Sequence, residues 1–168
     1  LDKEASGLIV FAKNAQVKQY LQEDWKNSQK KYYAIVEGAP EKESGTLSSF
    51  LRENKFLKVY SSKRKEDAKL SITHYRVLRA SGEYSLLEVE LGTGRKHQIR
   101  VHLSDLGHPI IGDERYGSKV NPIGRLALHA YFLALTHPIS GKRMVFQTPL
   151  PDIFERILEG ETQDREKP

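Results

Sequence analysis

The chain has 168 residues, of which 38% are hydrophobic and 29% charged, and its formal net charge is +5. These values predict one folded domain with a substantial core, and the positive charge favours a polyanionic partner, nucleic acid first. Cysteine is absent, which excludes disulfides, thiolate nucleophiles and cysteine-based zinc sites, and no apolar run approaches the ~20 residues that span a bilayer.

The first segment pairs an early carboxylate with an apolar run. Residues 7–12 contain five consecutive apolar side chains (LIVFA) and predict a short buried strand. Asp2 precedes this strand, in a loop that would expose its carboxylate. An aspartate before a Ser-Gly turn is most often a cap, so spacing alone leaves both a cap and a catalytic role open.

A helix and a strand are predicted next. Asn14 is a good N-cap for a surface helix over 15–27, on which Trp25 is expected to be a core anchor rather than a platform for a stacked base. Alternation over 30–37 predicts a strand with Tyr32 pointing inward. A buried tyrosine is usually part of a core, and the alternative is an aromatic floor for a bound base.

The rest of the chain is rich in strand patterns, interrupted by one helix. Residues 94–103 read GRKHQIRVHL, in which Ile99 and Leu103 form a helical stripe that Gly107 ends. The alternation of Ile99, Val101 and Leu103 would also allow a strand. Gly107 favours a short helix instead, with Arg100 at the edge of the core. Further strands are predicted over 46–52, 56–61, 70–79, 84–91, 125–135 and 144–146, with a helix over 153–158. This order indicates a meander-like antiparallel sheet with added helices.

The polar residues restrict the chemistry. His97, His102 and His108 lack the i, i+4 spacing that puts two metal ligands on one helical face, so no metal site is expected. Gly-rich phosphate loops are absent, so no nucleotide cofactor is expected. One carboxylate, one aromatic ring and one arginine remain. They suit nucleophilic or electrostatic catalysis on a substrate that brings its own reactive group.

Three segments, in order, resemble signature motifs of the RluA-type, large-subunit ribosomal RNA pseudouridine synthases. Residues 1–13 (LDKEASGLIVFAK) are similar to the catalytic-aspartate motif of that family, and residues 30–38 (KKYYAIVEG) to its tyrosine motif. Residues 94–103, followed by 107–117 (GHPIIGDERYG), are similar to a third signature. Three ordered matches over most of the chain are far more specific than any one of them.

The resemblance implies an α+β fold with a mixed, largely antiparallel central sheet flanked by helices. The catalytic domain would cover 1–160, followed by a polar tail over 161–168. The implied activity is that of an isomerase, an RNA pseudouridine synthase acting on specific uridines of ribosomal or transfer RNA. The resemblance also implies a cytoplasmic monomer that needs no cofactor and no metal and does not bind membranes.

The family's functional residues carry over to named positions. Asp2 matches the nucleophile, which attacks the target nucleoside at the base or the ribose, and Arg100 matches the basic residue that pairs with it. Tyr32 matches the aromatic residue that stacks on the uracil and helps to remove a proton late in the reaction. Leu128, in the segment 125–130 (RLALHA), would wall the base pocket.

The target uridine must leave its stack, at a cost of a few kcal/mol that phosphate contacts have to recover. Arg95, Lys96 and His97 are therefore expected to bind substrate. Other basic side chains are candidates for phosphate contacts: Lys3, Lys30, Lys31, Arg64, Lys65 and Arg115.

The chain departs from the family pattern in two places, and two rival functions stay open. The family usually carries His-Arg before the Leu-Asp pair, and that arginine takes part in base flipping, so an N-terminally truncated member is expected. Ala5 stands where threonine is common. The main rival is a non-catalytic RNA-binding domain, which would not need Asp2, Tyr32 and Arg100 together. The second is a nucleic-acid hydrolase with Asp2 as base, which the lack of a second carboxylate near the motifs disfavours.

Overall fold

A computed structural model describes residues 1–160, so the predicted tail over 161–168 lies outside the described residues. The described strands are β1 (Ser6–Gly7), β2 (Gln29–Glu37), β3 (Ser44–Glu53), β4 (Val59–Ser62), β5 (Lys69–Ala80), β6 (Tyr84–Leu91), β7 (Leu128–Thr136) and β8 (Arg143–Gln147). The helices are α1 (Ala15–Asp24), α2 (Gln98–Asp105) and α3 (Asp152–Leu158), with 3₁₀ turns η1 (Trp25–Asn27) and η2 (Glu114–Tyr116).

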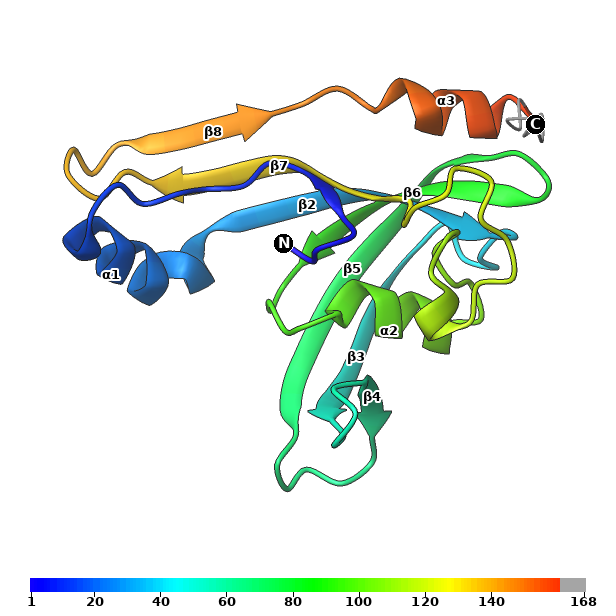
Figure 1. Ribbon diagram of the computed structural model, residues 1–168, viewed down its shortest axis with the longest axis horizontal. Helices are drawn as coiled ribbons and strands as arrows, with labels where there is room; N and C mark the ends of the chain where they lie inside the picture. Colours follow the sequence, from blue (N-terminus) through cyan, green and yellow to red (C-terminus); the bar gives the residue numbers. More distant parts are fainter. Residues whose placement is uncertain (161–168) are drawn as a thin grey trace, which may run out of the picture.

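The strands form one sheet in the order β1-β7-β2-β6-β5-β3-β4, with β8 also paired to β7. The β1–β7 pair is parallel, and the other strand pairs are antiparallel. The sheet bends strongly: β2, β7 and β8 run along its upper part, while β5, β3 and β4 descend from it, and α2 lies in the angle between them (Figure 1). The predicted α+β fold with a mixed, largely antiparallel sheet is confirmed.

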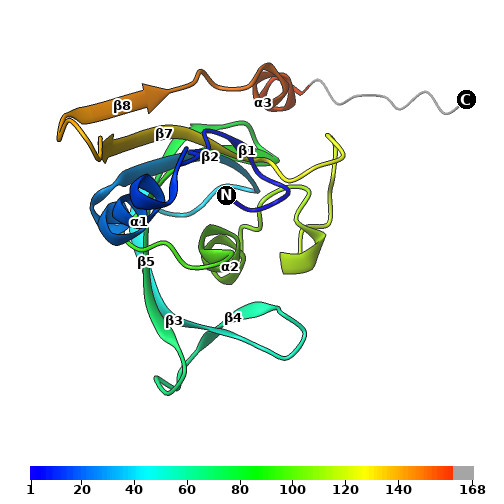
Figure 2. The same ribbon diagram turned by 60° about the vertical axis from the view of Figure 1, so that its left-hand side comes forward.

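The core fills the space between the sheet and its helices. Its largest buried side chains include Ile35, Leu87, Leu103, Ile110 and Phe154, contributed by the sheet, α2, the following loop and α3. Figure 2 shows α1 and α2 below the part of the sheet formed by β2 and β7, and α3 above it. None of the helices in residues 1–160 is long and apolar enough to cross a membrane.

The helix predicted from the 94–103 motif is present as α2, and it ends where Gly107 adopts a positive φ of 90°. Its apolar stripe enters the core as expected. Arg100 was expected at the edge of the core but is buried within it. His102 anchors the helix to the sheet, because its Nδ1 lies 2.8 Å from the hydroxyl of Thr73 and its Nε2 lies 2.9 Å from that of Ser49.

The buried strand predicted over 7–12 is wrong. β1 ends at Gly7, and the chain then runs on without regular structure, with Ile9 and Phe11 exposed. The reason lies in β7, whose edge is paired with β8 from Phe132 onward. The segment after Gly7 therefore cannot continue along β7, although its composition suits a strand.

Trp25 was expected to be a core anchor, and this is also wrong. The helix predicted over 15–27 forms, with Asn14 accepting a hydrogen bond from the Val17 amide, but no residue of α1 is fully buried. Trp25 sits in η1 with 39% of its surface exposed. The helix lies at the margin of the sheet, so its tryptophan faces a cavity instead of the core.

Acidification should destabilise the fold through His102. Burial lowers the pKa of this imidazole, and the charge of Asp105 acts in the opposite direction. The unfolded chain thus binds the proton more readily than the folded one. This contribution to stability is present above about pH 6.5 and is lost as the pH falls through the folded pKa. Thermal unfolding between about pH 8 and pH 5 should show a falling Tm, and His102→Gln should lose part of the dependence. An unchanged dependence in that variant would contradict the assignment to His102.

Candidate active site

A cavity of about 380 Å³ opens between the sheet and α2, beside the N-terminal residues. This volume is in the range of small-molecule binding sites. Five of the residues expected at the site line it: Asp2, Tyr32, Arg95, His97 and Leu128. The first motif, β2, the loop before α2 and β7 each contribute to it, so segments far apart in the sequence build one wall.

Arg100 lies in the core, directly behind the part of the cavity that Asp2 lines. Its Nε donates to Oδ2 of Asp113 at 2.7 Å and its Nη2 donates to Oδ1 at 2.8 Å, a bidentate pair. The remaining nitrogen, Nη1, lies 3.5 Å from Asp2 Oδ2 and 3.0 Å from Glu4 Oε2. The buried carboxylate fixes the plane of the guanidinium, and that plane directs one nitrogen at Asp2.

The charges around Arg100 keep it ionised. Burial alone would lower the pKa of the guanidinium, but the hydrogen bonds and charge of Asp113 raise it overall, and the charges of Asp2 and Glu4 add to the rise. Arg100 also lies over the ring of Tyr116, with its Cζ 5.1 Å from the ring centroid. The site therefore contains a permanent, immobile cation beside the Asp2 carboxylate.

His97 is fixed by the same tyrosine. The Tyr116 hydroxyl lies 2.8 Å from Nδ1 of His97 and accepts the backbone N–H of Val59 at 3.2 Å. Burial lowers the pKa of His97, the charge of Asp2 raises it, and Arg100 and other cations lower it further. A largely neutral imidazole thus lines the cavity at neutral pH, able to form a hydrogen bond with a bound molecule.

Tyr32 and Leu128 come from neighbouring strands. In the antiparallel β2–β7 pair, Tyr32 is opposite Ala130 and Ala34 is opposite Leu128. Tyr32 and Leu128 therefore lie on the same face of the sheet, and both side chains line the cavity. Burial raises the pKa of Tyr32 to about 12, and the charge of Asp2 contributes. The phenol is therefore protonated at neutral pH, and it offers a flat ring and a hydrogen-bond donor beside the carboxylate.

The loop that carries Asp2 is tied to β7 at several points. The Ser6 hydroxyl lies 2.8 Å from Nδ1 of His129, whose Nε2 lies 2.8 Å from the Thr148 hydroxyl. The N–H of Leu8 donates to the Ala130 carbonyl at 2.8 Å. Between them, Gly7 adopts a φ of +108° and lies against the backbone of Ala130. These contacts place Asp2 relative to Tyr32 and Arg100.

Gly7→Ala should displace the Asp2 loop. A Cβ at this position would lie 2.2 Å from the Ala130 oxygen, a distance at which the backbone has to move. Since a shift of ~1 Å in a catalytic group can cost ~100-fold in rate, we expect a loss of activity of that order. Gly82→Ala is the matched control, because Gly82 also has a positive φ but meets no atom within 4 Å. Equal activity of the two variants would contradict the role of Gly7.

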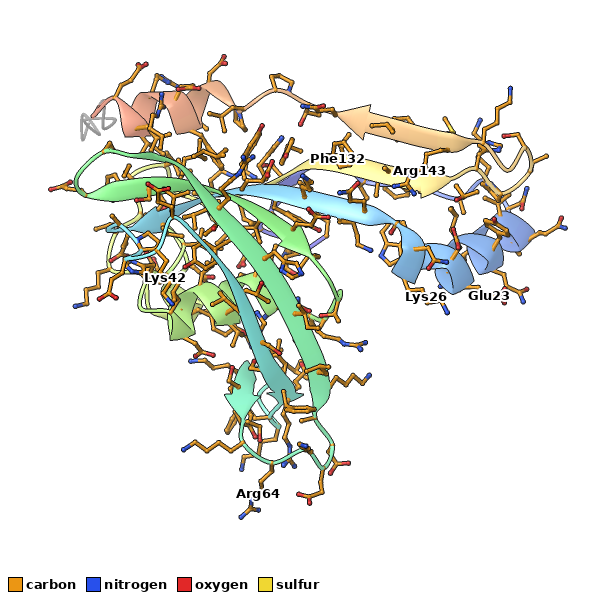
Figure 3. The ribbon with its side chains drawn as sticks, turned by 180° about the vertical axis from the view of Figure 1, so that it is seen from behind. Glu23, Lys26, Lys42, Arg64, Phe132 and Arg143 are labelled. Atoms are coloured by element: carbon orange, nitrogen blue, oxygen red, sulfur yellow. The ribbon has the colours of Figure 1, made fainter. Side chains whose placement is uncertain are left out.

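Two expected residues lie outside the cavity or behind it. Arg100 contacts Asp2 from the core, whereas Lys96 pairs with the Glu53 carboxylate and faces a separate hollow beside β3. Arg64, one of the candidates for a phosphate contact, lies at the far end of the descending part of the sheet (Figure 3). The structure thus gathers most of the predicted site but not all of its basic residues.

Sequence reasoning missed several residues of the site. The argument that no second carboxylate lies near the motifs is wrong, because Glu4 and Asp113 stand within them and both bind Arg100. Tyr116 was also missed. A usable signal existed, since Asp113 and Tyr116 stand at fixed places in the 107–117 motif, but only the fold brings that loop under α2.

Comparison with known proteins gives concordant matches. The profile of the family described as RNA pseudouridylate synthase matches residues 1–105. A Chloroflexus aurantiacus protein described as an uncharacterized RNA pseudouridine synthase is 41% identical, over 98% of this chain and 52% of the relative. The Haemophilus influenzae ribosomal large subunit pseudouridine synthase D is 34% identical, over 94% of this chain and 53% of the relative.

A solved structure is similar over nearly the whole chain. Human RNA pseudouridylate synthase domain containing 4 superposes with a TM-score of 0.80 at 28% identity, covering 96% of this chain and 73% of that one. The chain spans about half the length of the curated relatives it matches.

Proposed function

Because this chain belongs to the RluA-type group of RNA pseudouridine synthases, we propose that it converts specific uridines of ribosomal or transfer RNA to pseudouridine. The reaction is an isomerisation. The N1–C1′ bond of the uridine breaks, the uracil turns within the pocket, and a C5–C1′ bond forms. The C5 hydrogen leaves as a proton and N1 gains one, so the atoms balance without a cofactor or a metal.

The observation that carries the proposal is the chain of contacts from Asp113 through Arg100 to Asp2. A nucleophilic carboxylate has to be ionised, and a nearby fixed cation favours the ionised form. Asp113 holds that cation in one orientation. In the proposed mechanism Asp2 attacks the nucleoside at the base or the ribose, and its bond to the nucleoside breaks again before pseudouridine leaves, which regenerates the carboxylate. Arg100 keeps that carboxylate charged and directed at the substrate.

The cavity suits a flat, uncharged base. The Tyr32 ring is the proposed floor for the uracil, and Leu128 is the proposed wall beside it. The imidazole of His97 is within the lining and would form a hydrogen bond with a polar edge of the base. Since the Tyr32 hydroxyl is protonated at neutral pH, stacking and hydrogen-bond donation are the roles we assign to it in the free protein.

RNA is the proposed partner. The net charge of +5 favours a polyanion, and Arg95 at the cavity is a candidate for a phosphate contact. Lys96, paired with Glu53 outside the cavity, would contact RNA further along the strand. Such contacts would recover the cost of flipping the target uridine out of its stack. We propose a cytoplasmic monomer that acts on RNA in this way.

Tritium release is the direct test of this function. Total RNA labelled with tritium at C5 of uridine should lose tritium to water when incubated with the purified protein, because C5 gives up its hydrogen in the reaction. Binding of the RNA without release would indicate the rival function, an RNA-binding domain on the same scaffold. Strand cleavage without release would indicate a hydrolase.

A further inference from the structure

Lys30, one of the basic residues expected to contact phosphate, is a buried cation that takes no part in the bond changes of the proposed reaction. It lies on β2, on the same side as Tyr32, and lines the cavity with only 9% of its surface exposed. Its Nζ donates to the Trp25 carbonyl at 2.9 Å and to the Ser28 hydroxyl at 2.8 Å. Within residues 1–160, no carboxylate lies within ion-pair distance of Lys30. Glu88 and Glu90 form ion pairs with its neighbour, Lys31.

This charge is costly to bury without a counter-ion. Burial lowers the pKa of Lys30, and both of its hydrogen-bond partners are neutral. An ammonium has three N–H donors, and two are used. The third donor and the unbalanced charge are available to an anion that enters the cavity.

A second cavity adjoins the first at this point. It has a volume of about 460 Å³ and lies between residues 10–12 and α1, with mostly apolar lining. Val10 and Trp25 line both cavities, so the two lie side by side. The Trp25 ring has its centroid 5.2 Å from Lys30 Nζ, and Phe11 is 80% exposed beside it. The boundary between the cavities therefore carries one cation and one large, accessible aromatic ring.

We propose that the second cavity binds the nucleotide next to the target uridine, with its base stacked on Trp25 and with Lys30 contacting the phosphate that links the two nucleotides. The inference rests on the proposed function and deepens it. A phosphodiester that joins a uridine in the first cavity to a base in the second has to cross their boundary, where Lys30 lies. Aromatic rings beside a cation are the usual means of binding single-stranded nucleic acid.

The proposal sets a requirement on the substrate. Two adjacent nucleotides have to be unpaired for one to enter the first cavity and the other to stack on Trp25. Stacking tolerates any base, so the second cavity would require an unpaired neighbour without selecting its identity.

The fluorescence of the protein tests this without measuring activity, because Trp25 is the only tryptophan. Single-stranded RNA should quench Trp25, and a trinucleotide of uridines should quench it more than one in which both flanking positions are abasic. Equal quenching by the two trinucleotides, or no quenching by RNA that the protein binds, would contradict stacking on Trp25.

Lys30→Met tests the phosphate contact. We expect RNA affinity to fall by about tenfold or more, as for loss of a hydrogen bond to a charged group. The slope of log affinity against log salt should decrease by about 0.7, the contribution of one phosphate on a single strand. The loss should appear in KM, with kcat at saturating RNA changed little.

Lys26→Met is the matched control, since Lys26 is four residues away, points into solvent and lines neither cavity (Figure 3). It removes the same formal charge and should change affinity by less than about twofold, as expected for an exposed charge. Equal losses of RNA affinity in the two variants would show that Lys30 acts only through its contribution to the net charge, and would overturn the proposal.

A second pair of variants covers the case in which Lys30→Met fails to fold. Trp25→Leu should weaken RNA binding by about tenfold, whereas Trp25→Phe, which keeps a ring, should lose less. Equal losses in both would contradict stacking. If the parent protein binds RNA with quenching of Trp25 but releases no tritium, the proposed reaction is wrong and the proposal for the second cavity is supported. If the parent protein releases tritium and the variants at Lys30 and Trp25 bind RNA with the same affinity as the parent, only the proposal for the second cavity is contradicted.

Discussion

Asp2→Asn should abolish tritium release from C5-labelled RNA, with a fall in rate of about 10⁴-fold or more, as is typical when a nucleophile is removed. Asparagine has nearly the size of aspartate but cannot form the ionised carboxylate that the reaction needs. RNA binding should persist, because one of the three negative charges beside Arg100 is removed while the cavity keeps its shape.

Glu4→Gln is the matched control for Asp2→Asn. Glu4 approaches the same nitrogen of Arg100, at 3.0 Å, but its side chain is 61% exposed. We expect its loss to change activity by only a few-fold, because an exposed ion pair contributes little. Tritium release by Asp2→Asn at the parent rate would keep the enzyme but remove Asp2 from the role of nucleophile. A similar loss in both variants would indicate that the total charge beside Arg100 is what matters.

Asp113→Ala should cause the largest loss of stability among single substitutions at this site. The Asp113 side chain is fully buried and accepts two hydrogen bonds from Arg100, which is itself buried. Removing Asp113 leaves Nε and Nη2 of the buried guanidinium without their acceptor, and breaking a buried pair in this way costs about 3–5 kcal/mol. Urea denaturation should show this as a reduced free energy of unfolding and a lower midpoint.

The same variant should also lose activity in the fraction that stays folded. Without Asp113 the two hydrogen bonds that fix the plane of the guanidinium are lost, so Nη1 is held less firmly beside Asp2. Arg100→Met in the Asp113→Ala background separates the two effects, because it removes the guanidinium that has lost its buried partner and should recover part of the stability but none of the activity. A free energy of unfolding for Asp113→Ala within about 1 kcal/mol of Glu4→Gln would contradict a structural role for this pair, since exposed pairs contribute about that much.

The sequence by itself determined the elements that depend on local pattern. The helix at α2 follows from the spacing of Ile99 and Leu103 and from Gly107, and the alternating segments became β2, β5 and β6. Asp2, Tyr32 and Arg100 could be selected because they stand in motifs that resemble those of one family. A motif can identify functional residues because it is defined only by the order of residue types along the chain.

Only the tertiary structure decided which side chains meet. Asp113 binds Arg100 because the loop after α2 folds back beneath the helix, an arrangement that no spacing along the chain expresses. Residues 8–12 are apolar and suit a strand, yet β8 occupies the edge of β7 that they would need. Trp25 has the composition of a core residue, but its helix lies at the margin of the sheet and leaves the ring beside Lys30. Hydrophobic pattern specifies a tendency to be buried, whereas competition for strand edges and for space in the core decides which residues are buried and which line a site.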